Sequence, residues 1–312
     1  MKTAVIGAGG VGGFLTAMLA KHMENVSLVA RGERGNSIKE KGLTLESEYK
    51  GLFTVTPKVI PAVSALDEQD VIFICVKNYS LDEVCADLKN CISKNCILVP
   101  VMNGVDPADR VRAVFPENTV VDSLIYTISY SRPDFSICQM GNFTDLRIGI
   151  KDPSPKEKED LQTVSDILKA ADIDHKIAQD IQKEIWRKYI LNCAYNVTTA
   201  RHNKTIGPLR ENPETSKDYE SLVVEAYELG LALGVNLRPE YPLQIIHRFY
   251  NEHPADASSS LQRDIAAGKQ SELETFSGYV VRESERLGLQ SPVSKEYYQA
   301  LLQITSALNE AH

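Results

Sequence analysis

The sequence predicts an α/β protein with an N-terminal doubly wound parallel sheet and a C-terminal all-helical domain. Three observations support this fold class. A short apolar segment at residues 3–6 leads through a glycine-rich turn into apolar residues at helical spacing. Further apolar segments of strand length recur up to about residue 150, whereas the pattern after residue 178 is helical almost to the end. We therefore expect domains of residues 1–178 and 179–312.

Length, charge and cysteine content disfavour several classes of protein, among them nucleic-acid-binding, membrane-spanning and secreted proteins. The chain has 312 residues, enough for two domains, and a net charge of -8 without a block of lysine or arginine, which disfavours nucleic acid as a partner. No apolar segment is long enough for a bilayer, and the N-terminal residues suit a strand better than a signal peptide. Six cysteines without a C-x-x-C pair predict reduced thiols, with Cys75, Cys138 and Cys193 in the core, and the scattered histidines predict no metal site. We expect a cytoplasmic protein.

The N-terminal glycine turn has the spacing G-x-G-x-x-G, formed by Gly7, Gly9 and Gly12. Strand, turn and helix in this order are typical of a Rossmann-type dinucleotide site. Gly7 permits the tight turn, Gly9 leaves the backbone open to a pyrophosphate, and Gly12 lets the helix approach the strand. The alternative is a turn that serves packing alone. The cofactor-binding residues expected here are Gly7, Ala8, Gly9, Gly10, Val11 and Gly12.

The residue after the second expected strand, residues 26–30, bears on the choice of cofactor. An acidic residue at this position binds the ribose hydroxyls of NAD, but this chain has Arg31. A guanidinium matches phosphate oxygens with two parallel hydrogen bonds, which favours the 2′-phosphate of NADP(H). The alternative is a solvated arginine in a turn.

Two more polar residues follow expected strands. Lys77 comes after the apolar residues 71–76, and Asn103 comes after the strand expected at 96–101. Ligands of open α/β sheets bind at the carboxyl ends of the strands, so Lys77 is expected in the cofactor crevice. Asn103 is either a turn residue beside Gly104 or an amide that contacts the nicotinamide or the substrate.

The remaining elements follow from spacing and from breaks in the pattern. Residues 120–150 are expected to form antiparallel strands with breaks at 132–134 and 141–142, followed by a helix at 156–170 and a short segment near 174–177. The helices expected in the second domain are 180–200, 214–234, 240–252, 271–288 and 294–310.

A polar stripe crosses the first of these helices. Lys188, Asn192 and Asn196 are spaced at i, i+4 and i+8 and therefore share one face, surrounded by apolar residues. A buried lysine needs a partner or a task, although a lysine that extends to the surface would explain the pattern equally well. Further along, the serine cluster at 258–260 could cap a helix or bind an anion, and Glu272 is either solvated or faces Lys188.

Taken together, these motifs resemble the ketopantoate reductase (2-dehydropantoate 2-reductase) family almost from end to end. The matching segments are GAGGVGG at 7–13, Arg31, VK at 76–77, NG at 103–104, KYILNCAYNVTTA at 188–200, SSLQRD at 259–264 and SELETFSG at 271–278. The resemblance implies NADPH-dependent reduction of a 2-keto acid, with 2-dehydropantoate and pantoate as substrate and product.

The resemblance also implies roles for single residues. Arg31 and Lys77 would hold the 2′-phosphate end of the cofactor, and Lys188 would be the general acid. Glu272 would position cofactor and substrate, and Ser260 would bind the substrate carboxylate. The amides expected in the active cleft are Asn103, Asn192 and Asn196.

The chain also departs from the family pattern. Ile206 and Ala257 stand where members that make pantoate often carry asparagine, and Phe276-Ser277-Gly278 replaces the usual Ile-Asn-Gly. One alternative is therefore a paralogous NADP-dependent reductase of another small keto or hydroxy acid. A second is a non-catalytic NADP-binding regulator, which the retained Lys188 and Glu272 disfavour. The sequence leaves open whether the helical domain forms a homodimer.

Overall fold

The computed structural model describes residues 1–310 and divides the chain into two compact units, residues 1–184 and 185–312. The division falls within α6 (Ile181–His202), so the last four residues of unit 1 begin a helix that continues in unit 2. The boundary predicted between residues 178 and 179 stays a prediction. Each unit is described below by itself.

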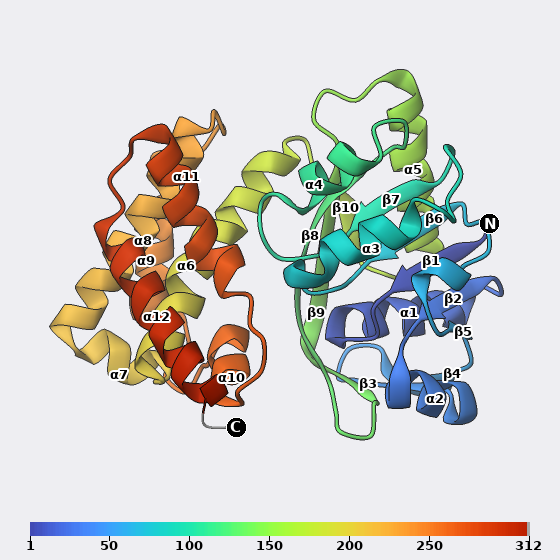
Figure 1. The fold of residues 1–312 in the computed structure, drawn as a ribbon, viewed down its shortest axis with the longest axis horizontal. Helices are drawn as coiled ribbons and strands as arrows, with labels where there is room; N and C mark the ends of the chain where they lie inside the picture. Colours follow the sequence, from blue (N-terminus) through green and yellow to red (C-terminus); the bar gives the residue numbers. More distant parts are fainter. Residues whose placement is uncertain (311–312) are drawn as a thin grey trace. The chain divides into compact units, whose positions relative to one another are not determined.

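Unit 1 is built on a five-stranded parallel sheet with the strand order β5-β2-β1-β6-β7 (Figure 1). Its strands are β1 (Thr3–Ile6), β2 (Val26–Val29), β5 (Lys58–Ile60), β6 (Val71–Ile74) and β7 (Ile97–Pro100). From β1 the chain first adds β2 on one side and later β6 on the other, in register from Thr3 opposite Val26 and Val71. The order of strands thus reverses at β1, and ligands of such sheets bind at this point.

Helices cover both faces of this sheet, as a doubly wound fold requires. Alternate strand residues point to opposite faces, so Val5 and Phe73 pack with residues of α1 (Gly10–His22) and α5 (Pro155–Ala170). Ile6 and Ile74 pack on the other face with residues of α3 (Leu81–Leu88) and α4 (Pro107–Val114). The predicted α/β class is confirmed.

A second sheet completes unit 1 and has the order β10-β9-β3-β4, with β8 paired to β9. Its strands are β3 (Leu43–Ser47), β4 (Gly51–Val55), β8 (Asp122–Ser131), β9 (Ile137–Gly149) and β10 (His175–Ile177). The antiparallel pair expected over 120–150 is confirmed, but its predicted break at 141–142 is wrong. β9 runs through Gly141, whose φ of +77° is accommodated without ending the strand.

Two helices of unit 1 escaped the sequence analysis, α4 and the helix that follows β2. α2 (Gly32–Lys41) follows β2 directly, and only Gly35 and Ile38 of its ten residues are buried. Two buried residues are too few to form an apolar repeat at helical spacing, so the sequence pattern did not indicate this helix. Two short 3₁₀ helices, η1 (Val63–Ala65) and η2 (Asn78–Ser80), complete the unit.

Unit 2 is helical, as predicted. Its elements after α6 are α7 (Ile206–Glu211), α8 (Pro213–Ala232), α9 (Tyr241–Asn251), α10 (Ser260–Ala266), the π-helical turn η3 (Glu274–Gly278), α11 (Tyr279–Leu287) and α12 (Pro292–Glu310). The helices α9, α11 and α12 pack against α8 (Figure 1). The short helices α7 and α10 were not predicted, because six or seven residues are too few for a clear period.

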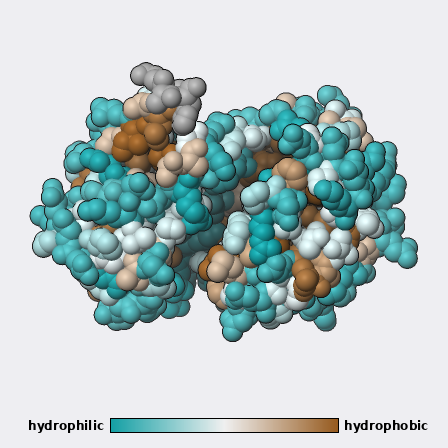
Figure 2. Space-filling model, turned by 90° about the horizontal axis from the view of Figure 1, so that it is seen from below, coloured by the Kyte–Doolittle hydropathy of each residue, from teal (hydrophilic) through white to brown (hydrophobic). Residues whose placement is uncertain are grey.

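One face of the protein is largely polar. On the face that Figure 2 shows, hydrophilic residues predominate and apolar residues gather in a few patches. Across residues 1–310, none of the helices combines the length and the apolar character that a membrane span needs.

Candidate functional site

Two of the three motif glycines in the turn after β1, Gly7 and Gly12, are needed for packing. Gly7 has a φ of +103°, and a Cβ there would lie 2.5 Å from the carbonyl oxygen of Cys75. A Cβ on Gly12 would overlap the carbonyl oxygen of Gly7. These two glycines thus allow a tight turn and let α1 lie directly against the loops that follow β1 and β6, as the motif predicted.

Gly9 has a different environment. Apart from its chain neighbours and the backbone of its own helix, no heavy atom of residues 1–310 lies within 4 Å of a Cβ built on it. Gly9 is the N-cap of α1, where backbone N–H groups lack helical acceptors. Open space beside a helix N-terminus is what a pyrophosphate requires, so the turn fits a dinucleotide.

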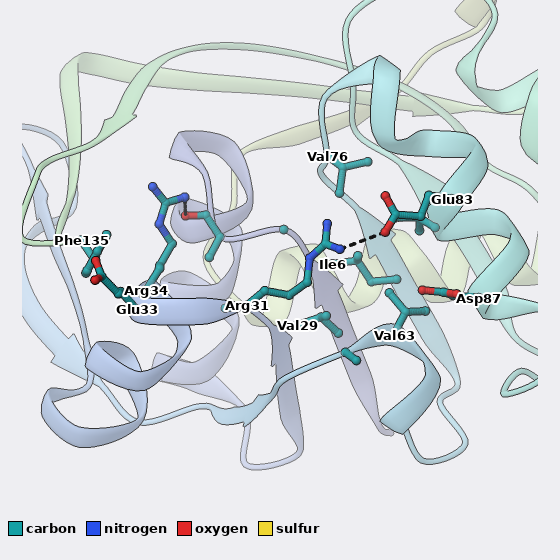
Figure 3. A pocket seen from close by; sticks show the side chains of 15 residues that line it. Ile6, Val29, Arg31, Glu33, Arg34, Val63, Val76, Glu83, Asp87 and Phe135 are labelled. Carbon is teal, nitrogen blue, oxygen red and sulfur yellow. Dashed lines mark hydrogen bonds and ion pairs between the residues drawn. The ribbon is translucent and has the colours of Figure 1, made fainter. Parts of the chain in front are cut away.

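A pocket of about 470 Å³ lies beside this turn, next to the carboxyl end of β2 (Figure 3). Five charged residues line it: Arg31, Glu33, Arg34, Glu83 and Asp87. Nη1 of Arg31 lies 2.9 Å from Oε1 of Glu83, and the two side chains are 65% and 58% exposed. Arg31 therefore lies where the sequence predicts it, but it forms an ion pair that the sequence did not indicate.

Arg34 is a second guanidinium at this pocket and was not singled out from the sequence. Its Nη1 donates to the carbonyl oxygen of Ala8 at 3.0 Å, and its Cζ lies 5.4 Å from the centre of the Phe135 ring. Burial lowers the pKa of Arg34. The one available signal was its position three residues after Arg31, on the first turn of the helix that follows β2.

Lys77 and Asn103 follow neighbouring strands. Ile74 of β6 is paired with Pro100 of β7, and each polar residue lies three positions further along, so both are at the carboxyl edge of the sheet. Both side chains are half-buried. The buried amide of Asn78 donates to the carbonyl oxygen of Asn103 at 2.7 Å and thereby fixes the Asn103 loop. The structure thus brings Lys77 and Asn103 to the same edge as the glycine turn.

In unit 2, α6 presents Lys188, Asn192 and Asn196 on one face, as their spacing predicts. Asn196 is 6% exposed, and the other two are half-buried. Elsewhere on the helix, the buried hydroxyl of Tyr189 donates to the carbonyl oxygen of Thr275 at 2.8 Å. This contact ties α6 to the segment that contains η3.

Glu272 precedes η3 and lies within electrostatic range of Lys188. Burial lowers the pKa of Lys188 to about 8, and the charge of Glu272 opposes this shift. Glu272 itself is only 5% exposed, so the alternative of a solvated glutamate is wrong. A lysine with a pKa near 8 and a carboxylate beside it can donate a proton close to neutral pH.

The serine cluster divides between two tasks. Ser259 caps α10, because its hydroxyl accepts a hydrogen bond from the backbone N–H of Gln262 at 3.1 Å. The hydroxyl of Ser260 instead donates to Oδ1 of Asn196 at 3.4 Å. Ser260 and Asn196 therefore form one polar contact at the α6 face, two helical turns beyond Lys188.

The two departures from the family pattern are neighbours in the structure. The backbone N–H of Ile206 donates to the carbonyl oxygen of Ala257 at 3.2 Å, and the Ile206 side chain is buried. Ala257 directly precedes the serine cluster. An apolar pair therefore adjoins the segment that carries Ser260.

All six cysteines are free, and Cys138 and Cys193 are buried as predicted, whereas Cys75 is only partly buried because it follows β6 in the loop. Within residues 1–310 there is no group of three or more histidine, cysteine, aspartate or glutamate side chains placed to hold a metal ion.

Comparison with known families identifies both parts of the chain. The family model described as ketopantoate reductase PanE/ApbA matches residues 3–152. The model described as ketopantoate reductase PanE/ApbA C terminal matches residues 180–305. The two models follow one another in the order that the resemblance predicts.

Individual relatives agree with the family models. The uncharacterized oxidoreductase YkpB of Bacillus subtilis strain 168 is 26% identical over 298 residues, which span 96% of this chain and 97% of that protein. A 2-dehydropantoate 2-reductase of Streptococcus pyogenes serotype M3 is 25% identical over 299 residues, with 94% of each chain covered. The crystal structure of a PanE/ApbA family ketopantoate reductase from Ralstonia eutropha JMP134 is 26% identical, with a TM-score of 0.90 and coverage of 99% and 100%.

Proposed function

Because the chain belongs to the ketopantoate reductase family of oxidoreductases, we propose that it reduces 2-dehydropantoate to pantoate with NADPH. The observation that carries this proposal is the environment of Lys188. Burial lowers its pKa to about 8, Glu272 lies within electrostatic range, and its helix face also holds Asn192 and Asn196. Such a group is suited to protonate a carbonyl oxygen during reduction.

Unit 1 would bind the cofactor. The turn from Gly7 to Gly12 would hold the pyrophosphate. Arg31, which lines the pocket, would hold the 2′-phosphate together with Lys77, which follows β6 at the same edge of the sheet. Asn103 would contact the nicotinamide or the substrate. Bound NADPH would supply the hydride that the C2 carbonyl carbon accepts.

Lys188 would supply the proton. Negative charge develops on the carbonyl oxygen as the carbon is reduced, and an ammonium within hydrogen-bond reach stabilises that charge and then transfers its proton. Glu272 would act on this step by keeping Lys188 protonated, because a nearby carboxylate favours the charged form of an amine.

Three polar side chains would hold the substrate. Ser260 would bind the substrate carboxylate, with Asn196 as its hydrogen-bonded neighbour. Asn192, between Asn196 and Lys188 on the same face of α6, would orient the keto acid without adding charge.

A spectrophotometric assay tests the proposal. Purified protein is mixed with NADPH and 2-dehydropantoate, and the decrease of NADPH absorbance is followed with pyruvate, 2-ketoisovalerate and NADH as controls. We expect rapid oxidation with 2-dehydropantoate and slow oxidation with the other keto acids. Tight NADPH binding without turnover of 2-dehydropantoate would contradict the proposed substrate and would still support the proposed cofactor.

One observation favours a second candidate, a reductase of another small keto or hydroxy acid. Ile206 and Ala257 place an apolar, hydrogen-bonded pair beside the serine cluster, where family members that make pantoate often carry asparagines. The same assay distinguishes the two candidates. A role in pantothenate synthesis, a cytoplasmic location and a homodimer stay predictions.

A further inference from the structure

The pocket beside Arg31 is not complementary to a phosphate in its overall charge. Two guanidinium groups line it, those of Arg31 and Arg34, but so do three carboxylates. A phosphate monoester carries a charge between about -1.5 and -2 near neutral pH. Lys77, which the proposed function assigns to the same phosphate, is not among the residues that line this pocket, and counting it would only make the basic side chains equal in number to the acidic ones. A site built only for a phosphate would be expected to be mainly basic.

The carboxylate nearest to Arg31 belongs to α3. Glu83 and Asp87 are one helical turn apart on this helix and both line the pocket. Figure 3 shows Arg31 and Glu83 pointing toward one another from opposite sides, joined by their 2.9 Å contact. Arg34 is directed away from them, toward the Ala8 carbonyl.

This arrangement combines the recognition elements for two cofactors. Sites for NAD use a carboxylate at the end of the second strand to bind the ribose hydroxyls, and in this chain Arg31 occupies that position. Glu83 brings a carboxylate to the same pocket from a different element, 52 residues along the chain. It can accept hydrogen bonds from a ribose diol, whereas it repels a 2′-phosphate and competes with it for Arg31.

We propose that Glu83 is the residue that determines how strictly the protein prefers NADPH, and that it keeps NADH usable by opposing the 2′-phosphate at Arg31. The inference rests on the proposed function, because it requires the pocket to take the adenosine ribose of a nicotinamide dinucleotide. Glu83 acts only on this end of the cofactor and has no part in the chemistry at the keto acid.

Direct binding tests the inference without turnover. Dissociation constants for NADPH and NADH are measured by calorimetric titration of the full-length protein, wild type and Glu83→Gln, in the absence of keto acid. Glu83→Gln removes both the ion pair that competes for Arg31 and the direct repulsion of the phosphate, so we expect it to raise the preference for NADPH about three- to tenfold. NADPH should bind more tightly and NADH no better than before.

Asp82→Asn is the matched control. Asp82 precedes Glu83 in the first turn of α3, but its carboxylate pairs with Arg110 at 2.7 Å instead of lining the pocket. The same loss of charge at this neighbouring position should leave the ratio of the two constants unchanged. The double variant Arg31→Gln with Glu83→Gln tests whether Glu83 acts through Arg31. The increase in NADPH affinity should be smaller in this variant, because the guanidinium that would bind the 2′-phosphate is missing.

The outcomes separate the two proposals. An unchanged ratio in Glu83→Gln, with NADPH and NADH both bound, would overturn the role of Glu83 and leave the proposed function intact. An equal shift in Asp82→Asn would show a general charge effect and would also overturn it. Wild-type protein that binds neither dinucleotide would remove the proposed function, and the inference with it.

Discussion

Lys188 is the residue whose chemistry depends most on its surroundings. An ordinary lysine is an ammonium at every physiological pH and gives up its proton reluctantly. Burial at the α6 face lowers the pKa of Lys188 to about 8, and the nearby Glu272 limits the shift. Proton donation near neutral pH is therefore a property of the position and not of the residue type.

Replacing Lys188 tests its role as proton donor. Lys188→Met keeps the length of the side chain and removes the ammonium, so kcat should fall about 10²- to 10⁴-fold. The NADPH dissociation constant, measured by calorimetric titration, should stay the same. Burial lowers the pKa of Lys188 from 10.5 to about 8, so its protonation destabilises the fold increasingly as the pH falls below 10.5, and fully below about pH 8. The variant should therefore melt no lower than wild type at pH 7.

Lys204→Ala is the control for this prediction, since Lys204 is an exposed lysine just beyond the same helix. It should retain wild-type turnover. Near-normal turnover in Lys188→Met would assign the proton to another group.

The pH profile tests the contribution of Glu272. The proton donor is lost as the pH rises through the pKa of Lys188, so the reduction rate of wild type should decline with a midpoint near pH 8. Glu272 raises the pKa of Lys188, so Glu272→Gln should move this midpoint to lower pH. The midpoint is read from kcat measured at a series of pH values.

Glu274→Gln is the matched control for the profile. Glu274 lies two residues further along, is exposed, and pairs with Arg282 at 2.7 Å. Its substitution should not move the midpoint. A profile of Glu272→Gln that coincides with the wild-type profile would contradict the coupling, whatever the effect on the absolute rate.

Among the elements, the glycine turn shows most clearly how one motif serves both folding and binding. Gly7 and Gly12 are required by the packing of α1 on the loops after β1 and β6, whereas Gly9 borders open space. The three positions of one motif therefore differ in what an added methyl group would meet. Substitutions at Gly12 and Gly9 can therefore test protein stability and cofactor binding separately.

Two alanine variants exploit the difference. Gly12→Ala forces a Cβ onto the Gly7 carbonyl, and such overpacking costs about 1–3 kcal/mol, so the melting temperature should fall by several degrees. Gly9→Ala should melt like wild type but bind NADPH at least about tenfold more weakly, because its methyl group occupies the approach to the helix N-terminus. Melting curves and calorimetric titrations check both. Wild-type NADPH affinity in Gly9→Ala would place the pyrophosphate elsewhere.

On the scale of the whole molecule, the proposal divides the work between the two units. The residues proposed to hold the pyrophosphate and the 2′-phosphate lie in unit 1, and the proposed proton donor, its neighbour Glu272 and the proposed carboxylate-binding residues lie in unit 2. Hydrogen exchange with mass spectrometry tests this division. NADPH at 100 times its dissociation constant stabilises the state that binds it by about 2.7 kcal/mol, so exchange in residues 7–13 should slow markedly. NADPH protection confined to residues 185–310 would contradict the assignment.

Much of the fold was predictable because it is recorded in local patterns. Buried strands, helix periods and the glycine spacing are short-range features, and they indicated the parallel sheet, the helical unit and the pairing over 120–150. The exceptions are also local. α2 has too few apolar residues to show a period, and β9 continues through Gly141 because a glycine can adopt the positive φ without ending the strand.

The sequence by itself determined which residues we propose for the chemistry: the glycines of the turn, Arg31, and the lysine and asparagines that share a face of α6. Only the tertiary structure decided their partners. Glu83 contacts Arg31 although the two are 52 residues apart in the sequence. Glu272 raises the pKa of Lys188 although several helices separate them along the chain. A side chain's spacing along one element follows from backbone geometry, but charge pairing and burial depend on segments that only folding brings together. The acidity of Lys188 therefore depends on the fold, and so does the choice of cofactor under our proposal for Glu83.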